Sequence, residues 1–204
     1  RPREISRTIL RTLKDHQIQA AGFVVGEKID DDLTNFVVIE DWTSQGHILG
    51  NQTYADVDLN ELDADEFLEH LDDGQNYLRR LSRAFDFSYR YIRFPFLHQG
   101  NSERKKNRVA KALYKADYKI APVTVKTSDY RFNQFYVERE GDPEKLSQLR
   151  LLFLEHITQA LDYAESQSEA VFSRNIHHIL WLRCGLATAQ FLEDLIVQLR
   201  DRGY

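Results

Sequence analysis

The sequence is poor in the residues and segments that mark disulfide-bonded, zinc-binding and membrane-spanning proteins. Its 204 residues contain no methionine and a single cysteine, Cys184. One cysteine excludes an internal disulfide and a zinc site built from several cysteines. No apolar stretch approaches the roughly 20 residues that a membrane-spanning helix needs, and no secretory signal peptide is visible. Because the chain starts Arg1-Pro2 and lacks methionine, we expect further residues to precede it in the parent protein.

Long blocks of one charge are also missing. The formal net charge is -5, and both signs are mixed along the chain. A nucleic-acid partner requires a basic face, so we expect none. We expect the one short basic run, Arg104-Lys105-Lys106, to be a solvated helix face. The apolar fraction of 42% suffices for one sizeable core, and we predict a single domain over residues 1–204.

What the chain does contain is an alternation of apolar runs and helical stripes. Runs that predict buried strands lie at 20–26, 47–50, 89–94, 120–125 and 178–182. Helical spacing predicts helices over 5–15 and 33–45, and others that begin at Asp63 (a capping box with Glu66), Ser102, Asp142-Pro143 and Thr188. This order implies an α/β fold with parallel strands and helical crossovers. Five strands are too few for a closed barrel, so the barrel is either irregular or incomplete.

Polar or rigid residues follow four of the predicted strands, where the chemistry of such folds resides. The segments read Gly-Asn-Gln-Thr-Tyr-Ala-Asp-Val-Asp-Leu-Asn over 50–60, Arg-Phe-Pro-Phe-Leu-His-Gln-Gly over 93–100, Lys-Thr-Ser-Asp-Tyr-Arg-Phe-Asn over 126–133 and Leu-Trp-Leu-Arg over 180–183. From about residue 5 to 204 the chain resembles the nodulation-type polysaccharide deacetylases, carbohydrate esterase family four. Their segments read Gly-Asn-His-Thr-Tyr-Ser-His-Pro-Asp-Leu-Asn, Arg-Phe-Pro-Phe or Arg-Tyr-Pro-Tyr, Asp-Thr-Ser-Asp-Trp, and Leu-Leu-His.

The resemblance implies an irregular (β/α) barrel that lacks its first strand within these residues. The family's opening segment, Thr-Phe-Asp-Asp-Gly-Pro, would lie just before Arg1 and is either present in the parent protein or lost. The resemblance also implies metal-assisted hydrolysis of an N-acetyl group on an amino sugar. A divalent metal, usually zinc, is held by an aspartate and two histidines, a second aspartate acts as base, and a histidine of the last segment protonates the leaving amine.

Several positions depart from that pattern. Gln52 and Asp56 stand where the two metal histidines belong, and an amide is a poor zinc ligand. Lys126 replaces an acid with a cation, and Arg183 replaces the proton donor with a group that stays protonated. The family-equivalent catalytic positions are Arg93, Lys126, Asp129 and Arg183; the expected substrate contacts are Gln52, Tyr54, Pro95, Phe96 and Tyr130; at most Asp56 remains as a metal ligand, and we expect no cofactor.

Some residues keep two interpretations. Arg93 either lines the groove or pairs with Asp129, and Cys184 is either a small buried residue or a thiol whose pKa is lowered by Arg183. The aromatic residues Tyr54, Phe96, Tyr130 and Trp181 form either a sugar-stacking platform or part of the core, with Trp181 expected in the core. We expect His98 to be structural, and we expect no metal pair at His177-His178, because neighbouring strand residues face opposite ways.

Two functions from different classes follow. The first is a catalytically inactive deacetylase-like domain that binds a polysaccharide or amino-sugar oligomer, or serves as a structural module. The alternative is a hydrolase that removes N-acetyl groups from amino-sugar polymers through an altered site with zinc or another divalent metal. The resemblance suggests an extracytoplasmic location, periplasmic or secreted, and leaves the oligomeric state open.

Overall fold

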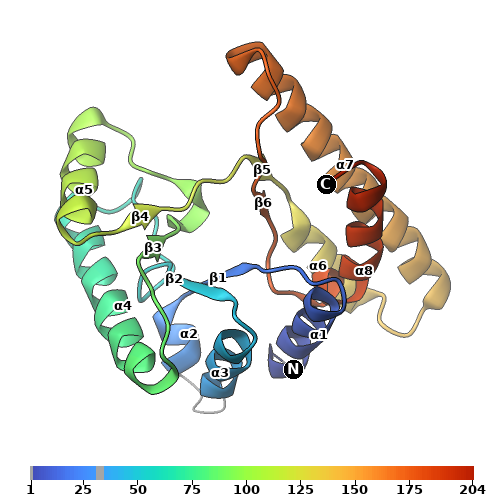
Figure 1. The fold of residues 1–204 in the computed structure, drawn as a ribbon, viewed down its shortest axis with the longest axis horizontal. Coiled ribbons are helices and arrows are strands. Elements are labelled where there is room, and N and C mark those ends of the chain that lie inside the picture. The colour runs from blue at the N-terminus through green and yellow to red at the C-terminus, as the bar shows by residue number, and fades with distance from the viewer. Residues whose placement is uncertain (1, 31–34) are drawn as a thin grey trace. The chain divides into compact units, whose positions relative to one another are not determined.

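The structure, a computed structural model, describes residues 2–30 and 35–204, drawn as a ribbon in Figure 1. The chain forms two compact units. One is Gln17–Pro122, and the other combines Arg1–His16 with Val123–Tyr204. Each unit has its own strands, helices and buried side chains, so each is described by itself.

Four parallel strands form the sheet of the Gln17–Pro122 unit, in the order β1-β2-β3-β4 (Figure 1). They are β1 (Ala21–Val24), β2 (Ile48–Asn51), β3 (Tyr91–Ile92) and β4 (Lys119–Ile120). Gly50 of β2 is opposite Phe23 of β1, and a Cβ at position 50 would lie 2.5 Å from the Phe23 ring. A glycine is therefore needed for these two strands to pair.

The helices of this unit begin at local signals that the sequence carries. They are α2 (Gly26–Asp30), α3 (Phe36–Ser44), α4 (Ala64–Phe85) and α5 (Glu103–Lys115), with one 3₁₀ turn, η2 (Pro95–Leu97). The predicted capping box at Asp63 and Glu66 is confirmed, and Ser102 accepts a hydrogen bond from Lys105 N at 3.3 Å. Both caps satisfy amide groups that the first turn leaves unpaired.

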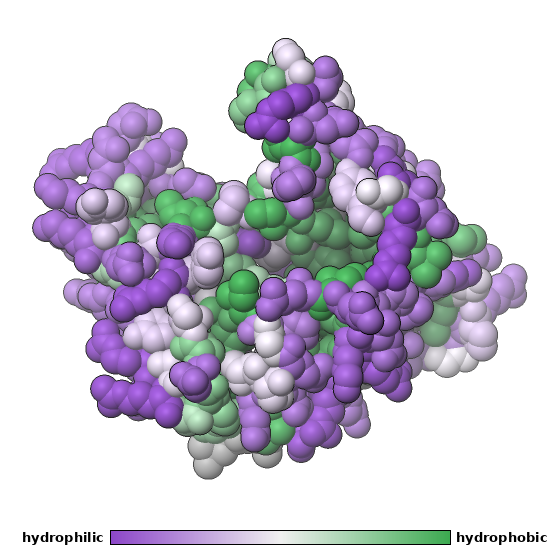
Figure 2. All heavy atoms as spheres, in the orientation of Figure 1, coloured by the Kyte–Doolittle hydropathy of each residue, from purple (hydrophilic) through white to green (hydrophobic). Residues whose placement is uncertain are grey.

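One apolar cluster holds α4 and α5 against the sheet. Its buried members are Leu59, Phe67, Leu71, Ile92, Phe94, Val109, Leu113 and Tyr118. On the face shown in Figure 2, hydrophilic residues predominate over the outer surfaces of α4 and α5. Leu59 belongs to the loop after β2, so this cluster also fixes that loop.

The other unit is mostly helical. Its elements are α1 (Pro2–Asp15), β5 (Val125–Lys126), α6 (Asp129–Glu138), α7 (Pro143–Phe172), β6 (Leu180–Trp181) and α8 (Leu186–Asp201). The strands β5 and β6 pair in parallel, with Lys126 opposite Trp181. Asp142 caps α7 as predicted, accepting from Lys145 N at 3.1 Å. Phe153 and Ile157 of α7 are fully buried.

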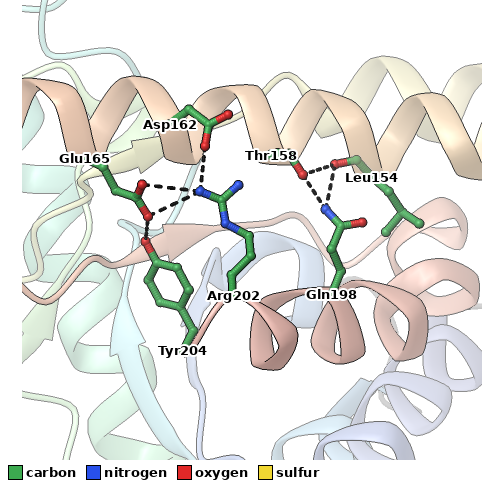
Figure 3. Close-up of polar contacts among 7 residues, drawn as sticks. All are labelled: Leu154, Thr158, Asp162, Glu165, Gln198, Arg202 and Tyr204. Atoms are coloured by element: carbon green, nitrogen blue, oxygen red, sulfur yellow. Dashed lines mark hydrogen bonds and ion pairs between the residues drawn. The ribbon is translucent and has the colours of Figure 1, made fainter.

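Polar contacts join α7 to α8 and to the residues just after it (Figure 3). Arg202 reaches Asp162 at 2.5 Å and Glu165 at 3.3 Å, and the Tyr204 hydroxyl also bonds Glu165. These contacts fix the last residues on the long α7 helix.

The α/β class with parallel strands and helical crossovers is confirmed. Within the described ranges the strands form two separate sheets and no closed barrel. The single strand predicted over 120–125 is wrong. Ala121 N continues the first sheet by bonding Ile92 O, whereas Thr124 N bonds Ile179 O in the other unit. Pro122, which has no amide hydrogen, lies between the two halves.

Three further predictions need correction. Residues 129–133 belong to α6 and do not form a loop, and α8 begins after Gly185 with Thr188 buried inside it, so Thr188 is no cap. Arg104 and Lys106 are exposed as expected, but Lys105 is only partly exposed, because its ammonium bonds the carbonyls of Leu59 and Leu62. Residues 33 and 34 of the predicted second helix lie outside the described residues.

No helix in the described part of the chain is both long enough and apolar enough to cross a membrane.

Candidate functional site

The loop after β2 is fixed by uncharged hydrogen bonds beneath it. Asn51 is fully buried, accepts from Thr53 N at 2.8 Å, and donates to Leu71 O at 3.2 Å and to the Tyr118 hydroxyl at 2.9 Å. Burial raises the pKa of Tyr118 to about 12, partly offset by the bond from Asn51. The hydroxyl therefore stays neutral and available as an acceptor over the whole physiological range.

A glycine of α4 lets the helix approach this loop. A Cβ on Gly74 would lie 2.6 Å from Asn51 Oδ1 and 2.8 Å from the carbonyl carbon of Thr53. Tyr54 N, next in the loop, donates to His70 O of the same helix at 2.8 Å. The loop and α4 are thus packed backbone against backbone.

The predicted metal position lies on this loop and is occupied by a side-chain network. Gln52 Nε2 donates to Asp56 Oδ1 at 3.1 Å. Lys28 Nζ, from α2, lies 3.4 Å from Asp56 Oδ2. Both oxygens of the one remaining carboxylate are therefore engaged by protein donors, one of them a cation.

These residues do not fit a catalytic divalent metal. A zinc site needs three protein ligands with free lone pairs, whereas the two family metal positions, Gln52 and Asp56, offer one carboxylate, which is already bonded to an amide and an ammonium. Among the residues that the structure describes, no group of three or more histidine, cysteine, aspartate or glutamate side chains is arranged to hold a metal.

Tyr54 points its hydroxyl at a carboxylate of its own unit. The hydroxyl donates to Asp30 Oδ2 at 3.0 Å, and the ring meets that of Tyr77 edge-on at 6.2 Å. Burial raises the pKa of Tyr77 to about 12, with the charge of Asp30 adding to the effect. Tyr54 is partly exposed and held in one orientation.

The segment after β3 presents a buried arginine. Arg93 is 5% exposed, its Nε donates to Ala121 O at 3.1 Å, and its guanidinium lies 4.4 Å above the Phe23 ring. Burial lowers the pKa of Arg93. Pro95 starts the η2 turn and is buried, whereas Phe96 is 41% exposed with a positive φ of 56°.

His98 connects this segment to the loop after β2. Its Nδ1 lies 2.8 Å from Asp58 Oδ2, in line with the structural role expected for it. Burial by itself would raise the pKa of Asp58. Hydrogen bonds from Asn60 N and His98, and the charges of His98 and Lys105, outweigh that effect and leave the pKa below its ordinary value.

Asp129, in the other unit, begins α6 and is 4% exposed. Arg183 N donates to its Oδ2 at 2.6 Å, and the Thr127 hydroxyl donates to its Oδ1 at 3.3 Å. Burial raises the pKa of Asp129 despite these donors and the charge of Arg183.

Three predicted site residues meet on the surface near Asp129. The guanidinium of Arg183 lies 5.3 Å from the Tyr130 ring centre and 5.4 Å from that of Trp181. Lys126 is exposed and is the register partner of Trp181. Trp181 is half-buried and its ring lies against Arg183. The prediction that Trp181 belongs to the core is therefore wrong.

Cys184 does not have a lowered pKa. Surrounding protein atoms and the charge of Asp129 both raise the pKa of its thiol, although the residue as a whole is exposed. Of the two interpretations of Cys184, the thiol with a lowered pKa is therefore wrong.

The predicted site residues therefore form two groups. Gln52, Tyr54, Asp56, Arg93, Pro95 and Phe96 belong to one unit; Lys126, Asp129, Tyr130 and Arg183 belong to the other. The predicted ion pair of Arg93 with Asp129 would join the units, and it stays a prediction. The ion-pair roles of Lys28 and Asp58 were not predicted, because their partners are distant in the chain and no local sequence signal indicates the contacts.

Comparisons with known proteins agree on one family. The family model described as polysaccharide deacetylase matches residues 1–121. A peptidoglycan-N-acetylglucosamine deacetylase of Bacillus cereus is 28% identical over 93 residues, which are 46% of this chain and 32% of that protein. The chain thus spans about a third of the length of this curated relative.

Solved structures share the fold at low identity. A CE4 family pseudoenzyme from Bacillus anthracis superposes with a TM-score of 0.70 at 17% identity, covering 100% of this chain and 60% of that one. The chitin deacetylase of the fungal pathogen Colletotrichum lindemuthianum gives a TM-score of 0.66 at 22% identity, covering 98% of this chain and 77% of that one. At these identities the likeness concerns the fold.

Proposed function

Since this chain belongs to the polysaccharide deacetylase family, we propose that it binds a glycan without carrying out metal-dependent deacetylation. The observation that carries the proposal is the pairing of Asp56. Gln52 and Lys28 donate to its two oxygens at 3.1 and 3.4 Å, where the family resemblance implies a metal. A divalent cation would have to displace an amide and an ammonium, and would then find one ligand in place of three.

The position of the leaving-group acid supports the same proposal. Arg183 stands there, and a guanidinium does not release a proton at neutral pH. Its side chain is stacked on Tyr130 and Trp181, an arrangement that suits holding a ligand. Binding therefore needs no rebuilt chemistry, whereas hydrolysis needs both a metal and a proton donor.

The proposal covers the whole of residues 1–204 as one deacetylase-like domain acting outside the cytoplasm on a polysaccharide or amino-sugar oligomer. The Bacillus anthracis neighbour is described as a pseudoenzyme, and a mutant of it as having restored enzymatic activity. That pair supports the idea that this fold persists when catalysis is absent.

A second candidate is a hydrolase that removes N-acetyl groups through an altered site. The buried carboxyl of Asp129 favours it, because burial raises its pKa toward the range in which a carboxyl can donate a proton. This candidate also needs a source of activation for the attacking water, and no group of three or more histidine, cysteine, aspartate or glutamate side chains among the described residues is arranged to hold a metal for it.

The test combines metal content, acetate release and glycan binding on the chain. We expect dialysis against zinc to leave far less than one metal ion per chain, and incubation with N-acetylglucosamine oligomers to release no acetate. We also expect calorimetric titration with the same oligomers or with peptidoglycan fragments to give measurable binding. About one bound metal per chain together with acetate release would overturn the proposal in favour of the hydrolase.

Variants test whether the Lys28 ammonium excludes a metal from the position of Gln52 and Asp56, in addition to the missing histidines. Gln52→His with Asp56→His and Lys28→Ala removes the cation and supplies two imidazoles, and we expect it to bind zinc more tightly than the parent chain. The matched control keeps Gln52→His and Asp56→His and replaces Lys28→Ala by Lys106→Ala, because Lys106 is an exposed lysine whose acidic partner, Glu103, is 3.9 Å away. If the control raises zinc binding equally, the Lys28 pairing is not what excludes the metal.

A further inference from the structure

A cluster of cations and aromatic rings lies on the surface of the Arg1–His16 and Val123–Tyr204 unit. We define the cationic-aromatic cluster as Lys126, Tyr130, Arg131, Trp181 and Arg183. Arg183 lies against both rings, and Arg131 lies 5.8 Å from the Tyr130 ring centre with its Nε 3.3 Å from the Tyr130 hydroxyl. Strand pairing places Lys126 beside Trp181. Residues from two strand ends and one helix therefore converge on one patch.

The guanidinium of Arg183 is held in place before any ligand arrives. Its two ring contacts of 5.3 and 5.4 Å restrict the side chain, and its backbone N–H is fixed by Asp129 Oδ2 at 2.6 Å. A planar guanidinium stacked on rings keeps its edge N–H donors free to receive a carboxylate or phosphate. Less side-chain entropy is then lost on binding than for a free surface arginine.

No salt bridge links the cations of the cluster to an acid in the described part of the chain. Lys126, Arg131 and Arg183 are all without one, although the net charge of the chain is -5. Asp129 and Arg183 interact electrostatically, but Asp129 is buried and its two oxygens accept from Arg183 N and from Thr127. Three exposed cations therefore face solvent around a Tyr130 ring that is 48% exposed.

We propose that the cationic-aromatic cluster binds an acidic glycan, with Arg183 contacting an anionic oxygen group and Tyr130 stacking on the adjacent sugar ring. This inference rests on the proposed function and narrows it, because a purely neutral amino-sugar polymer would leave the three cations without partners. The shared chemistry is an anionic group on a sugar, and carboxylate and phosphate are its two sources.

The experiment titrates the chain with three oligosaccharides of matched length. They are a neutral N-acetylglucosamine hexamer, a galacturonate hexamer that carries carboxylates, and a phosphomannan hexamer that carries phosphates. At low salt we expect an acidic hexamer to bind at least about tenfold more tightly than the neutral one, and the preference to weaken as salt screens the charges. Whichever acidic hexamer binds more tightly identifies the source.

Variants assign the preference to this cluster. Arg183→Gln should lower affinity for the acidic hexamer about tenfold and leave the neutral hexamer nearly unchanged. Arg183→Lys should recover only part of the loss, since it keeps the charge without the planar stack. Arg139→Gln is the matched control, because Arg139 also lies over one ring, Phe135 at 5.1 Å, but already pairs with Glu138 at 3.3 Å. It should leave both affinities unchanged.

The outcomes separate this inference from the proposed function. Equal binding of neutral and acidic hexamers, or an equal loss in Arg139→Gln, would overturn the acidic preference while leaving glycan binding intact. Acetate release with an Arg183-dependent acidic preference would overturn the non-catalytic proposal and leave this inference standing. If no hexamer binds to the chain, both fail.

Discussion

The two groups of site residues differ in how their charges are handled. In the Gln17–Pro122 unit the carboxylate of Asp56 pairs with Lys28 and accepts a hydrogen bond from Gln52, and Asp58 is hydrogen-bonded to His98. In the other unit Arg183 is stacked on aromatic rings and forms no salt bridge among the described residues. One group is internally satisfied, whereas the other keeps its charge available. Under the proposed function, the paired carboxylate of Asp56 leaves no room for a metal in one unit, while the cationic-aromatic cluster of the other unit binds the glycan.

The largest effect on the free energy of unfolding should come from shortening the buried apolar side chain of the loop after β2 that carries Gln52 and Asp56. Leu59 lies in the loop after β2 and is 0% exposed, so Leu59→Ala should cost about 2–5 kcal/mol of unfolding free energy. Tyr130→Ala should cost less than about 1 kcal/mol, because Tyr130 is 48% exposed. Chemical denaturation of both variants checks this. Similar losses of unfolding free energy in the two variants would mean that Tyr130 contributes as much to the stability of its unit as Leu59 does to the other.

Gly74→Ala should lower stability by about 1–3 kcal/mol through overpacking. The new Cβ would lie 2.6 Å from Asn51 Oδ1, even though alanine is the better helix former. Asp73→Ala, on the exposed face of α4, is the control and should change stability little. A gain in stability for Gly74→Ala would show that the loop yields easily and that the first group is not rigid.

Asp58→Asn tests the charge pairing of the first group through pH. The folded-state pKa of Asp58 is lowered from 3.8, so its contribution is present above pH 3.8 and is lost as the pH falls through the lowered value. We expect a loss of about 1–2 kcal/mol at pH 5.5 that shrinks below pH 3.8. Denaturant titrations at several pH values measure this.

The pKa of Asp129 is shifted in the opposite direction to that of Asp58. The folded-state pKa of Asp129 is raised from 3.8, so its ionised form destabilises the fold, and this penalty shrinks as the pH falls through the raised pKa and is gone below pH 3.8. For Asp58, a loss of stability in Asp58→Asn that grew as the pH was lowered would contradict the lowered pKa assigned to that carboxyl.

Lys28→Ala should have the smallest effect on stability. The Lys28 side chain is 62% exposed and its contact with Asp56 is 3.4 Å, so the pair should contribute less than about 0.5 kcal/mol. Thermal unfolding checks this. A cost above 1.5 kcal/mol would mean that Lys28 supports the fold as well as neutralising Asp56.

The sequence predicted those parts of the fold whose signals are local. Capping residues Asp63, Ser102 and Asp142 act within three residues of their own position, so their helices could be predicted. Helix α6 was missed because its sequence is rich in aromatic residues, which are weaker helix formers. Distant contacts stabilise it, such as the ring pair Phe132–Phe153 at 5.5 Å.

The site was predictable to the extent that motif positions reveal it. The segment over 50–60 located Gln52 and Asp56 correctly on one loop, where they bond each other. Lys28 could not be assigned, because it meets Asp56 only through the pairing of β1 with β2. The ring contacts of Arg183 likewise depend on α6 and β6 meeting, which a linear pattern does not show.

In a pooled screen of single substitutions that reports only protein abundance, Asn51, Thr53 and Gly74 should be depleted as strongly as core leucines. They hold the loop after β2 on α4 with uncharged groups and take no part in proton or metal chemistry. Under the proposed function, selection for a foldable chain alone would be enough to retain Gly50, Asn51, Thr53 and Tyr54. Depletion at these positions in the screen would then measure folding and not turnover.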